Sequence, residues 1–358
     1  MKAGLWEKEA RLSQYDKIDY MEVYRLAEEQ SVIGLVAAGI EHVPENKIPQ
    51  DVVLSVVGDM LQLEQQNQAM NEFVAKLIEK LRKEDVYAIL VKGQGIAQCY
   101  ERPLWRTSGD VDLLLNDQNY EKAKKVLLPL AIEVDTEYKS LKHLGITMKE
   151  GFVVELHGML HSRLSNRIDR TIDEAQNDIF YGGKVRSWEN NGTQVFLPAP
   201  DNDVIFIFTH ILKHFYIEGI GLRQICDWCR LLWTYKDSLD HELLVSRIRK
   251  MGLMSEWRAF AALAVDWLGM PAGAIPLYSS ERKWSKKAEK IIESVLEMGN
   301  FGHNRDRVAS KSYLGGKLAS TYRKLKDFGH HMRIFPVDSV NFFCYFALDG
   351  IGGAMRGE

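Results

Sequence analysis

The middle of the chain, residues 85–198, alternates short β-forming runs with segments of helical spacing. VYAILVKG at 86–93 and DVDLLL at 110–115 are rich in β-branched and aliphatic residues, and a short helix is expected between them at 95–101. YEKAKKVLLPL at 120–130 carries apolar residues at helical intervals. Strand, helix, strand and helix in this order predict an α/β or α+β domain.

The second half of this region predicts antiparallel strands. Residues 132–138 and 143–160 are strand-like, and the Lys-Glu-Gly sequence at 149–151 supplies a turn within the second run. The Asn-Asn-Gly sequence at 190–192 is a strong turn signal and predicts a further hairpin. The sheet is therefore expected to be mixed.

Both flanks of this core have helical spacing. Apolar residues recur at helical intervals in residues 21–40 and along residues 50–83, which predicts an N-terminal helical region over residues 1–84. Residues 199–358 are expected to form a C-terminal helical domain. The helices expected there are Asp201 or Asp203 to Phe215, Leu222–Tyr235, Glu242–Met251, Glu256–Gly269, Ser285–Leu296, Leu314–Lys326 and Val340–Leu348.

The composition is that of a folded chain with nearly balanced charge. Its 358 residues suggest about two domains, or one domain with helical additions. The formal net charge of −3 disfavours a global attraction to long nucleic acid. The four cysteines do not suggest a disulfide framework, and neither a signal peptide nor an apolar run of roughly 20 residues is found. We expect a cytoplasmic protein with reduced thiols and no membrane association.

Two aspartates at the start of one expected strand are the first candidate site residues. If DVDLLL is a strand, Asp110 and Asp112 project to the same face with Cα atoms roughly 6–7 Å apart, while Val111 and Leu113 face a core. Neighbouring carboxylates repel each other, and a divalent cation relieves that repulsion. Mg²⁺, or Mn²⁺ in its place, suits an all-oxygen site that substrate phosphates can complete.

A third acid occurs in a similar apolar strand. Glu155 lies in FVVELHG, and on a neighbouring strand it could point towards the aspartate pair. Three converging carboxylates can hold two metal ions about 3.5–4 Å apart. His157 is two residues further on and hence on the same face as Glu155. It is either a contact for nucleotide or substrate, or a half-buried supporting histidine.

A glycine-containing turn follows the first expected strand. Lys92-Gly93-Gln94-Gly95 ends the strand and opens the short helix. Glycine lets the backbone approach a phosphate, and a helix N-terminus offers free N–H groups. This sequence is neither the GxxxxGK[ST] loop nor GxGxxG.

The order of these motifs resembles the nucleotidyltransferase superfamily that includes DNA polymerase beta. VKGQGIAQCYERPLWRTSGDVDLLL followed by VVELHGML looks more closely like a bacterial branch described as uncharacterised nucleotidyltransferases. The resemblance covers roughly residues 85–160, and residues 200–235 more weakly. It implies an α+β fold with a polymerase beta-like mixed-sheet core flanked by N-terminal helices and a C-terminal helical domain. It further implies that Asp110, Asp112 and Glu155 are catalytic metal ligands.

The same resemblance suggests residues for nucleotide binding. Lys92, Gly93 and Gln94 belong to the expected phosphate turn. Arg106, four residues before Asp110, is the preferred cation for the triphosphate, ahead of Lys92 and Arg102. Ser108 and Gly109 would shape the approach to the metal, and His157 is a candidate contact for nucleotide or substrate. The superfamily's usual Gly-Ser turn is Gly-Gln here, and Asp110 lies 17 residues after Gly93. The turn hydroxyl is therefore missing, and any phosphate contact there uses backbone groups.

Other metal-like patterns are weaker. Cys226 and Cys229 form a single CxxC inside an expected helix, which favours core packing over zinc. His210 and His214 are four apart, but the sequence between them lacks the glutamate of HExxH.

The sequence thus predicts a metal-dependent nucleotidyltransferase. It would transfer a nucleoside monophosphate from an NTP, with ATP preferred, to a hydroxyl or amine of a small-molecule or protein acceptor, and release pyrophosphate. One alternative is a catalytically weak nucleotide-binding regulator or an antitoxin-like interaction module on the same fold. Another is a helical interaction protein whose α/β insert is only structural.

Overall fold

The chain forms two compact units in a computed structural model that describes residues 1–12, 15, 17–43, 48–300 and 327–356. The first unit contains residues 1–161 and 172–204, and the second contains 162–171 and 205–358. The division expected at residues 84 and 198 stays a prediction. The helix expected at Leu314–Lys326 lies outside the described residues.

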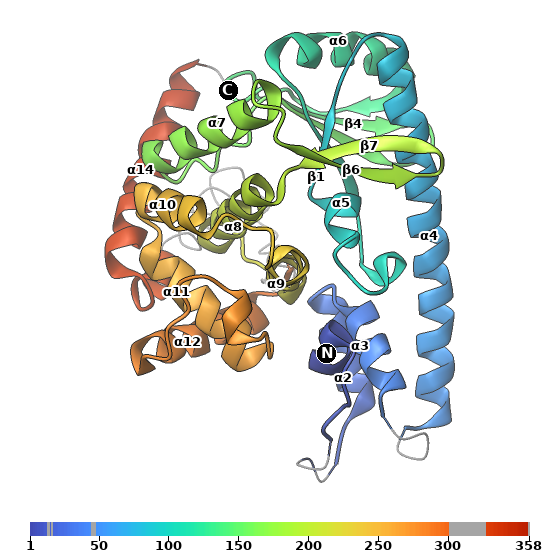
Figure 1. Cartoon of the computed structure of the whole chain (residues 1–358), viewed down its shortest axis with the longest axis vertical. Coiled ribbons are helices and arrows are strands. Elements are labelled where there is room, and N and C mark those ends of the chain that lie inside the picture. Colours follow the sequence, from blue (N-terminus) through green and yellow to red (C-terminus); the bar gives the residue numbers. More distant parts are fainter. Residues whose placement is uncertain (13–14, 16, 44–47, 301–326, 357–358) are drawn as a thin grey trace, which may run out of the picture. The chain divides into compact units, whose positions relative to one another are not determined.

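A seven-stranded mixed sheet forms the centre of the first unit (Figure 1). Its order is β3-β4-β5-β2-β1-β7-β6. β2 pairs in parallel with β5, and β1 pairs in parallel with β7, whereas the other neighbours are antiparallel. The predicted mixed sheet and α+β class are confirmed. The strands are β1 Ile89–Val91, β2 Asp110–Leu114, β3 Ala131–Val134, β4 His143–Met148, β5 Val153–His157, β6 Val185–Asn190 and β7 Thr193–Pro198.

Both predicted hairpins form. β4 and β5 pair on either side of residues 149–151, and β6 and β7 pair on either side of Asn191 and Gly192. Asn191 and Gly192 both have positive φ, at 49° and 79°. Two consecutive residues with positive φ match the twist of a tight hairpin, and asparagine and glycine adopt positive φ at least cost. The local sequence therefore determines this turn.

Two helices cover one face of the sheet. α4 (Gln50–Lys83) contributes a stripe that includes Phe73, Leu77 and Leu81, and α6 (Asp117–Leu127) contributes Tyr120 and others to the same core. The sheet residues in this core are alternate ones, including Val111 and Leu113 of β2 and Val154 and Leu156 of β5. Because side chains alternate along a strand, the residues between them face the other side of the sheet.

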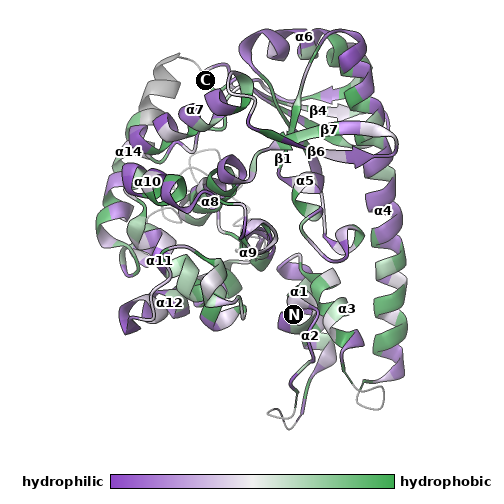
Figure 2. Cartoon of the chain, in the orientation of Figure 1, coloured by the Kyte–Doolittle hydropathy of each residue, from purple (hydrophilic) through white to green (hydrophobic). Residues whose placement is uncertain are grey.

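The N-terminal helices pack on the first half of α4. Val52, Val56 and Met60 of α4 form a second cluster with Ala37, and the hydrophobic colouring in Figure 2 marks this part of α4. Residues 21–40, whose apolar residues recur at helical spacing, form two helices with a break between them. These are α2 (Tyr20–Glu29) and α3 (Ile33–Glu41), separated at Ser31, whose φ is 55°. A non-glycine residue with that φ cannot continue a right-handed helix.

The helix α7 (Asn166–Phe180), which follows β5, was not expected from the sequence. The short helix α5 (Gly93–Ala97) follows β1, where a short helix was expected. The buried residues Ile168, Ile172, Ala175 and Ile179 of α7 are spaced by four, three and four, which is the helical interval that should have revealed it.

The second unit is helical, as expected. Its helices include α8 (Pro200–Ile217), α9 (Leu222–Tyr235), α10 (His241–Met251), α11 (Met254–Ala262), α12 (Arg282–Met298) and α14 (Pro336–Arg356). The expected helix at 256–269 changes into a π-helical turn at Leu263–Trp267. Phe208, Trp228 and Trp257 pack ring against ring in its core. Cys226 and Cys229 are fully buried, as core packing requires. Among the described helices, none is long and apolar enough to cross a bilayer.

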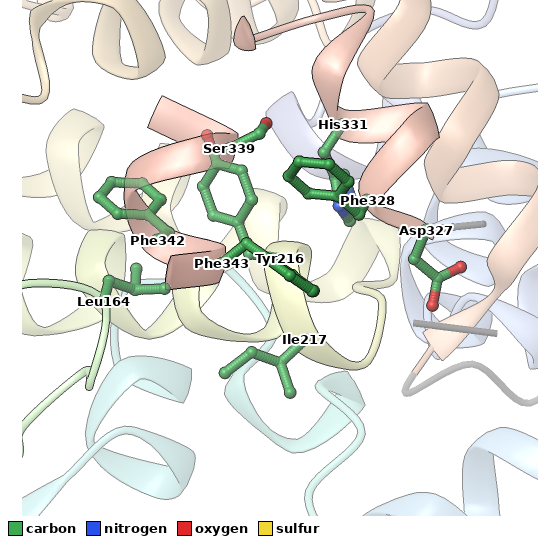
Figure 3. A pocket seen from close by; sticks show the side chains of 9 residues that line it. All are labelled: Leu164, Tyr216, Ile217, Asp327, Phe328, His331, Ser339, Phe342 and Phe343. Carbon is green, nitrogen blue, oxygen red and sulfur yellow. The ribbon is translucent and has the colours of Figure 1, made fainter. Parts of the chain in front are cut away.

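A cavity of about 50 Å³ in the second unit lies between α8 and α14 and is lined mainly by aromatic side chains, including Tyr216 and Phe342 (Figure 3). The Tyr216 hydroxyl donates a hydrogen bond to Glu256 Oε1 at 3.2 Å. Burial of the Glu256 side chain, together with the negative charge of Asp338, raises the pKa of this carboxyl to about 8. Tyr216, which lines the cavity, thus hydrogen-bonds to a carboxyl that is protonated at neutral pH.

The Glu256 carboxyl predicts a pH-dependent stability. Between its ordinary pKa near 4.5 and the folded value near 8, the folded chain holds a proton that the unfolded chain has lost. Stability should therefore fall as pH rises through this range. Glu256→Gln should flatten that dependence and raise the Tm at pH 8 by a few degrees. Thermal unfolding from pH 5 to 9 would measure this, with exposed Glu293→Gln on α12 as the control. An unchanged pH profile in Glu256→Gln would contradict the assignment.

Candidate metal and nucleotide site

Parallel pairing of β2 with β5 brings the three predicted carboxylates together. Asp112 is the direct partner of Glu155 in this pairing, and Asp110 is two residues before Asp112. All three side chains project from the face of the sheet opposite the core that α4 and α6 cover. One carboxylate oxygen from each lies within 4.8 Å of one from each of the others. The sequence prediction that these acids converge is therefore met by the strand register.

This donor set fits a hard divalent cation. Three carboxylates supply only oxygen ligands, which Mg²⁺ and Mn²⁺ accept, and they leave positions for water and phosphate oxygens. Such an ion would be held by Asp110, Asp112 and Glu155, the residues expected from the sequence.

Lys92 neutralises the most buried carboxylate. Its Nζ lies 2.7 Å from Asp112 Oδ1, and the Asp112 side chain is only 2% exposed. Burial alone would raise the pKa of Asp112, but the charge of Lys92 and a hydrogen bond from His157 reverse this and lower it. Burial would lower the pKa of Lys92, but the negative charge of Asp112 reverses this and raises it. Both groups are therefore charged at neutral pH.

The turn after β1 has an unusual backbone conformation. Lys92 has φ 56° and ψ −144°, a region that is essentially confined to glycine and costs other residues about 1–3 kcal/mol. Gly93 follows with φ 36°, and a Cβ there would lie 3.3 Å from the carbonyl oxygen of Asp110. The strained turn therefore brings the backbone of residues 92 and 93 close to the start of β2, beside the carboxylates.

Two histidines hydrogen-bond to the carboxylates. His157 Nε2 donates to Asp112 Oδ1 at 2.7 Å and lies 3.3 Å from Glu155 Oε2. His143 Nε2 lies 3.2 Å from the same Glu155 oxygen. Burial would raise the pKa of Glu155, but these two histidines offset it, and the pKa lies well below its ordinary value.

His143 is a site residue that the sequence reasoning missed. It is the direct partner of His157 across the antiparallel pair of β4 and β5. Because the hairpin turn at 149–151 was recognised, counting outwards by equal steps from residue 150 would have paired 143 with 157. The position of the turn therefore already indicated that His143 lies beside His157.

Most of the chain matches one family. Residues 16–269 match the uncharacterised nucleotidyltransferase family. The chain belongs to this family. A crystal structure of an antigenic nucleotidyltransferase-like protein from Paracoccidioides brasiliensis is 15% identical, with a TM-score of 0.36, and the alignment covers 59% of this chain and 94% of that one. No curated protein matches the chain significantly. The family assignment makes the chain a nucleotidyltransferase and agrees with the acidic cluster.

In this nucleotidyltransferase the buried amide of Asn67 links the turn after β1 to the loop before β2. Asn67 Nδ2 donates to the carbonyl oxygens of Leu104 and Arg106, at 2.7 and 3.0 Å. Its Oδ1 accepts from Gln94 Nε2 at 2.9 Å. The Gln94 side chain is thus engaged within the fold, and any phosphate contact at this position uses its backbone.

The loop before β2 carries the predicted cation. Arg106 Nη1 donates to Ser108 Oγ at 3.0 Å and to the carbonyl oxygen of Thr107 at 3.3 Å. Gly109 has open space where a Cβ would lie. Arg102 forms ion pairs with Glu41 and Glu7, as a structural cation does. Arg106, Ser108 and Gly109 therefore remain the candidates from this loop.

Removing the Asn67 amide should loosen this loop. Asn67→Ala leaves the Gln94 amide and two carbonyl oxygens without their partner, and unmade buried hydrogen bonds cost about 1–3 kcal/mol. We expect the free energy of unfolding of the first unit to fall by about 2 kcal/mol. Urea unfolding followed by circular dichroism would measure it, with the exposed neighbour Gln68→Ala as the control. Equal stability of the two variants would contradict this role.

Proposed function

We propose that this nucleotidyltransferase transfers a nucleoside monophosphate from an NTP, with ATP as the first candidate, to a hydroxyl or amine acceptor. The observation that carries the proposal is the convergence of Asp110, Asp112 and Glu155 beside the Lys92–Gly93 turn. The acceptor oxygen or nitrogen forms a bond to the α-phosphorus as the bond to the β-phosphate breaks. The proton of the acceptor passes to solvent, and pyrophosphate leaves.

A divalent ion on the carboxylates would supply electrostatic stabilisation for the attacking and leaving groups. Glu155 holds and orients rather than accepting a proton, because its lowered pKa makes it a weak base at neutral pH. His157 fixes the Asp112 carboxylate through its hydrogen bond. Asp110 and Asp112 serve as the principal metal ligands.

The cations of the site have separate roles in this proposal. Lys92 is paired with Asp112 in this structure. When a metal takes over the charge of Asp112, the Lys92 ammonium becomes available to the triphosphate. Arg106 offers a second cation from the loop before β2, with Ser108 and Gly109 beside it, and the backbone of Gly93 and Gln94 borders the phosphate path.

A catalytically weak nucleotide-binding regulator is the second candidate. The observation that favours it is the ion pair of Asp112 with Lys92 together with the hydrogen bond from His157, which satisfy this carboxylate without a metal. An antitoxin-like role on the same fold belongs to this alternative. Its distinguishing property would be magnesium-dependent nucleotide binding without turnover.

Two measurements separate these functions. Thermal unfolding with each of the four NTPs, with and without Mg²⁺, would identify the nucleotide by its stabilising effect. An α-labelled NTP of that kind, incubated with small-molecule and protein acceptors, would reveal transfer and pyrophosphate release. Transfer supports the enzyme, and binding alone supports the regulator. Absence of any magnesium-dependent stabilisation by all four NTPs would argue against both.

The acceptor class rests on charge. A net charge of −3 favours a small molecule or a protein over long nucleic acid. A cytoplasmic location and a bacterial origin stay predictions.

A further inference from the structure

We propose that the Glu155 side of the site binds a transition-metal ion through His143, Glu155 and His157. This would be a second metal position beside the Asp110 and Asp112 carboxylates, with nitrogen as well as oxygen ligands. The role of such an ion in transfer rests on the proposed function. Its binding does not, and it can be tested without nucleotide.

The three side chains converge, so that one ligand atom of each lies close to the others. His143 and His157 face each other across the pair of β4 and β5, and their ring centroids are 4.8 Å apart. Their Nε2 atoms lie 3.2 and 3.3 Å from the same oxygen of Glu155. His157 Nε2 also lies 2.7 Å from Asp112 Oδ1, and it would exchange that hydrogen bond for the metal. One ligand atom from each of the three residues lies within 4.8 Å of the others. Two imidazoles thus turn the same ring nitrogen towards one carboxylate oxygen.

The chemistry of this donor set differs from that of the aspartates. Imidazole nitrogen suits Fe²⁺, Co²⁺, Ni²⁺ and Zn²⁺, whereas Mg²⁺ prefers oxygen and near-octahedral geometry. Two histidines and one carboxylate also leave coordination positions open for substrate or water. Glu155 belongs to both groups. The pocket therefore offers a hard oxygen site beside a mixed nitrogen and oxygen site.

A further carboxylate, that of Asp135, lies over the neighbouring strand β4. Gly145 on β4 is the direct partner of Glu155, so its Cβ position points to the same face of the sheet. A Cβ at Gly145 would lie only 2.2 Å from Asp135 Oδ2. The Asp135 carboxylate therefore occupies the space over β4 that any other residue at 145 would fill.

Cobalt binding to the full chain tests this site. Co²⁺ is titrated into the wild-type protein without nucleotide and in the presence of excess Mg²⁺. Visible absorption bands should appear and saturate at one equivalent, because nitrogen ligands retain Co²⁺ against Mg²⁺. His143→Gln should weaken this binding at least tenfold. Asp110→Asn should retain the bands, because Asp110 belongs to the oxygen site. His161→Gln is the matched control, since His161 pairs with Asp173 and is similarly exposed.

A second measurement needs no variant. Substoichiometric Zn²⁺, added in the presence of excess Mg²⁺, should shift the ring nitrogen NMR signals of two of the ten histidines selectively in the wild-type chain. Uniform or absent shifts, cobalt binding that is equal in His143→Gln and wild type, or complete displacement by Mg²⁺ would each overturn the proposal. Intact cobalt binding in a protein that transfers no nucleotide would instead refute the proposed function and support the metal site.

Discussion

Asp110→Asn is expected to reduce nucleotidyl transfer by about a thousandfold while leaving the fold intact. The substitution keeps the size of the side chain and removes one charged ligand from the metal-binding group. A metal at such a site provides several kcal/mol of transition-state stabilisation, and a loss of about 4 kcal/mol corresponds to a factor of a thousand. Asp110 suits this test better than Asp112, because Asp112 also balances the buried charge of Lys92.

Steady-state kinetics with the preferred NTP would measure this loss, with circular dichroism as the check on folding. Asp117→Asn is the control, since Asp117 is also an aspartate near the start of its element but forms an exposed ion pair with Lys142. Full activity in Asp110→Asn would refute the mechanism. An equal loss in Asp117→Asn would show that the effect is not specific to the metal ligands.

Lys92→Met is expected to destabilise the first unit by about 3 kcal/mol when Mg²⁺ is absent. The Asp112 side chain is 2% exposed, and the Lys92 side chain is 19% exposed. Removing one partner of a buried ion pair costs about 3–5 kcal/mol because it leaves an unbalanced charge, and the partial exposure of Lys92 places the effect at the low end. Methionine retains most of the aliphatic length of lysine, so the loss of packing is small.

Mg²⁺ should restore much of that lost stability. A divalent ion on Asp110 and Asp112 would balance the charge that lysine balanced, so Mg²⁺ should raise the Tm of Lys92→Met more than that of the wild type. Lys124→Met is the matched control, since Lys124 pairs with Glu137 and is 18% exposed. Its destabilisation should not respond to Mg²⁺. A rise in Tm that is no larger in Lys92→Met than in Lys124→Met would show that Lys92 does not substitute for a metal.

Local patterns in the sequence predicted the parts of the fold that depend on short-range rules. Alternation along DVDLLL placed Asp110 and Asp112 on one face, and the turn at 190–192 predicted the hairpin that forms there. The break between α2 and α3 at Ser31 was not predicted, because the helical spacing of apolar residues continues across it and only the backbone conformation of Ser31 interrupts the helix. α7 was missed although its apolar spacing is regular.

The finer features of the site depend on contacts between segments far apart in the sequence. The partner of Lys92 is 20 residues away, and Asn67 reaches Gln94 over 27 residues and the loop at Arg106 over 39 residues. Nothing in the local sequence of α4 marks Asn67 as more than a polar residue on a helix. His143 shows the intermediate case, because its position follows once the register of one hairpin is known.

The parallel pairing of β2 and β5 determines which segments of this chain can change in length and which cannot. The two strands are joined by a long crossover through α6, β3 and β4, whose length does not determine which residue of β5 lies beside Asp112. Loops in that crossover can gain or lose residues over evolution with little effect on the pocket. A single-residue deletion inside β5 would instead turn Glu155 into the hydrophobic layer and bring Leu156 to the solvent side. Relatives of this chain should therefore differ in crossover length while keeping the spacing within VVELH unchanged.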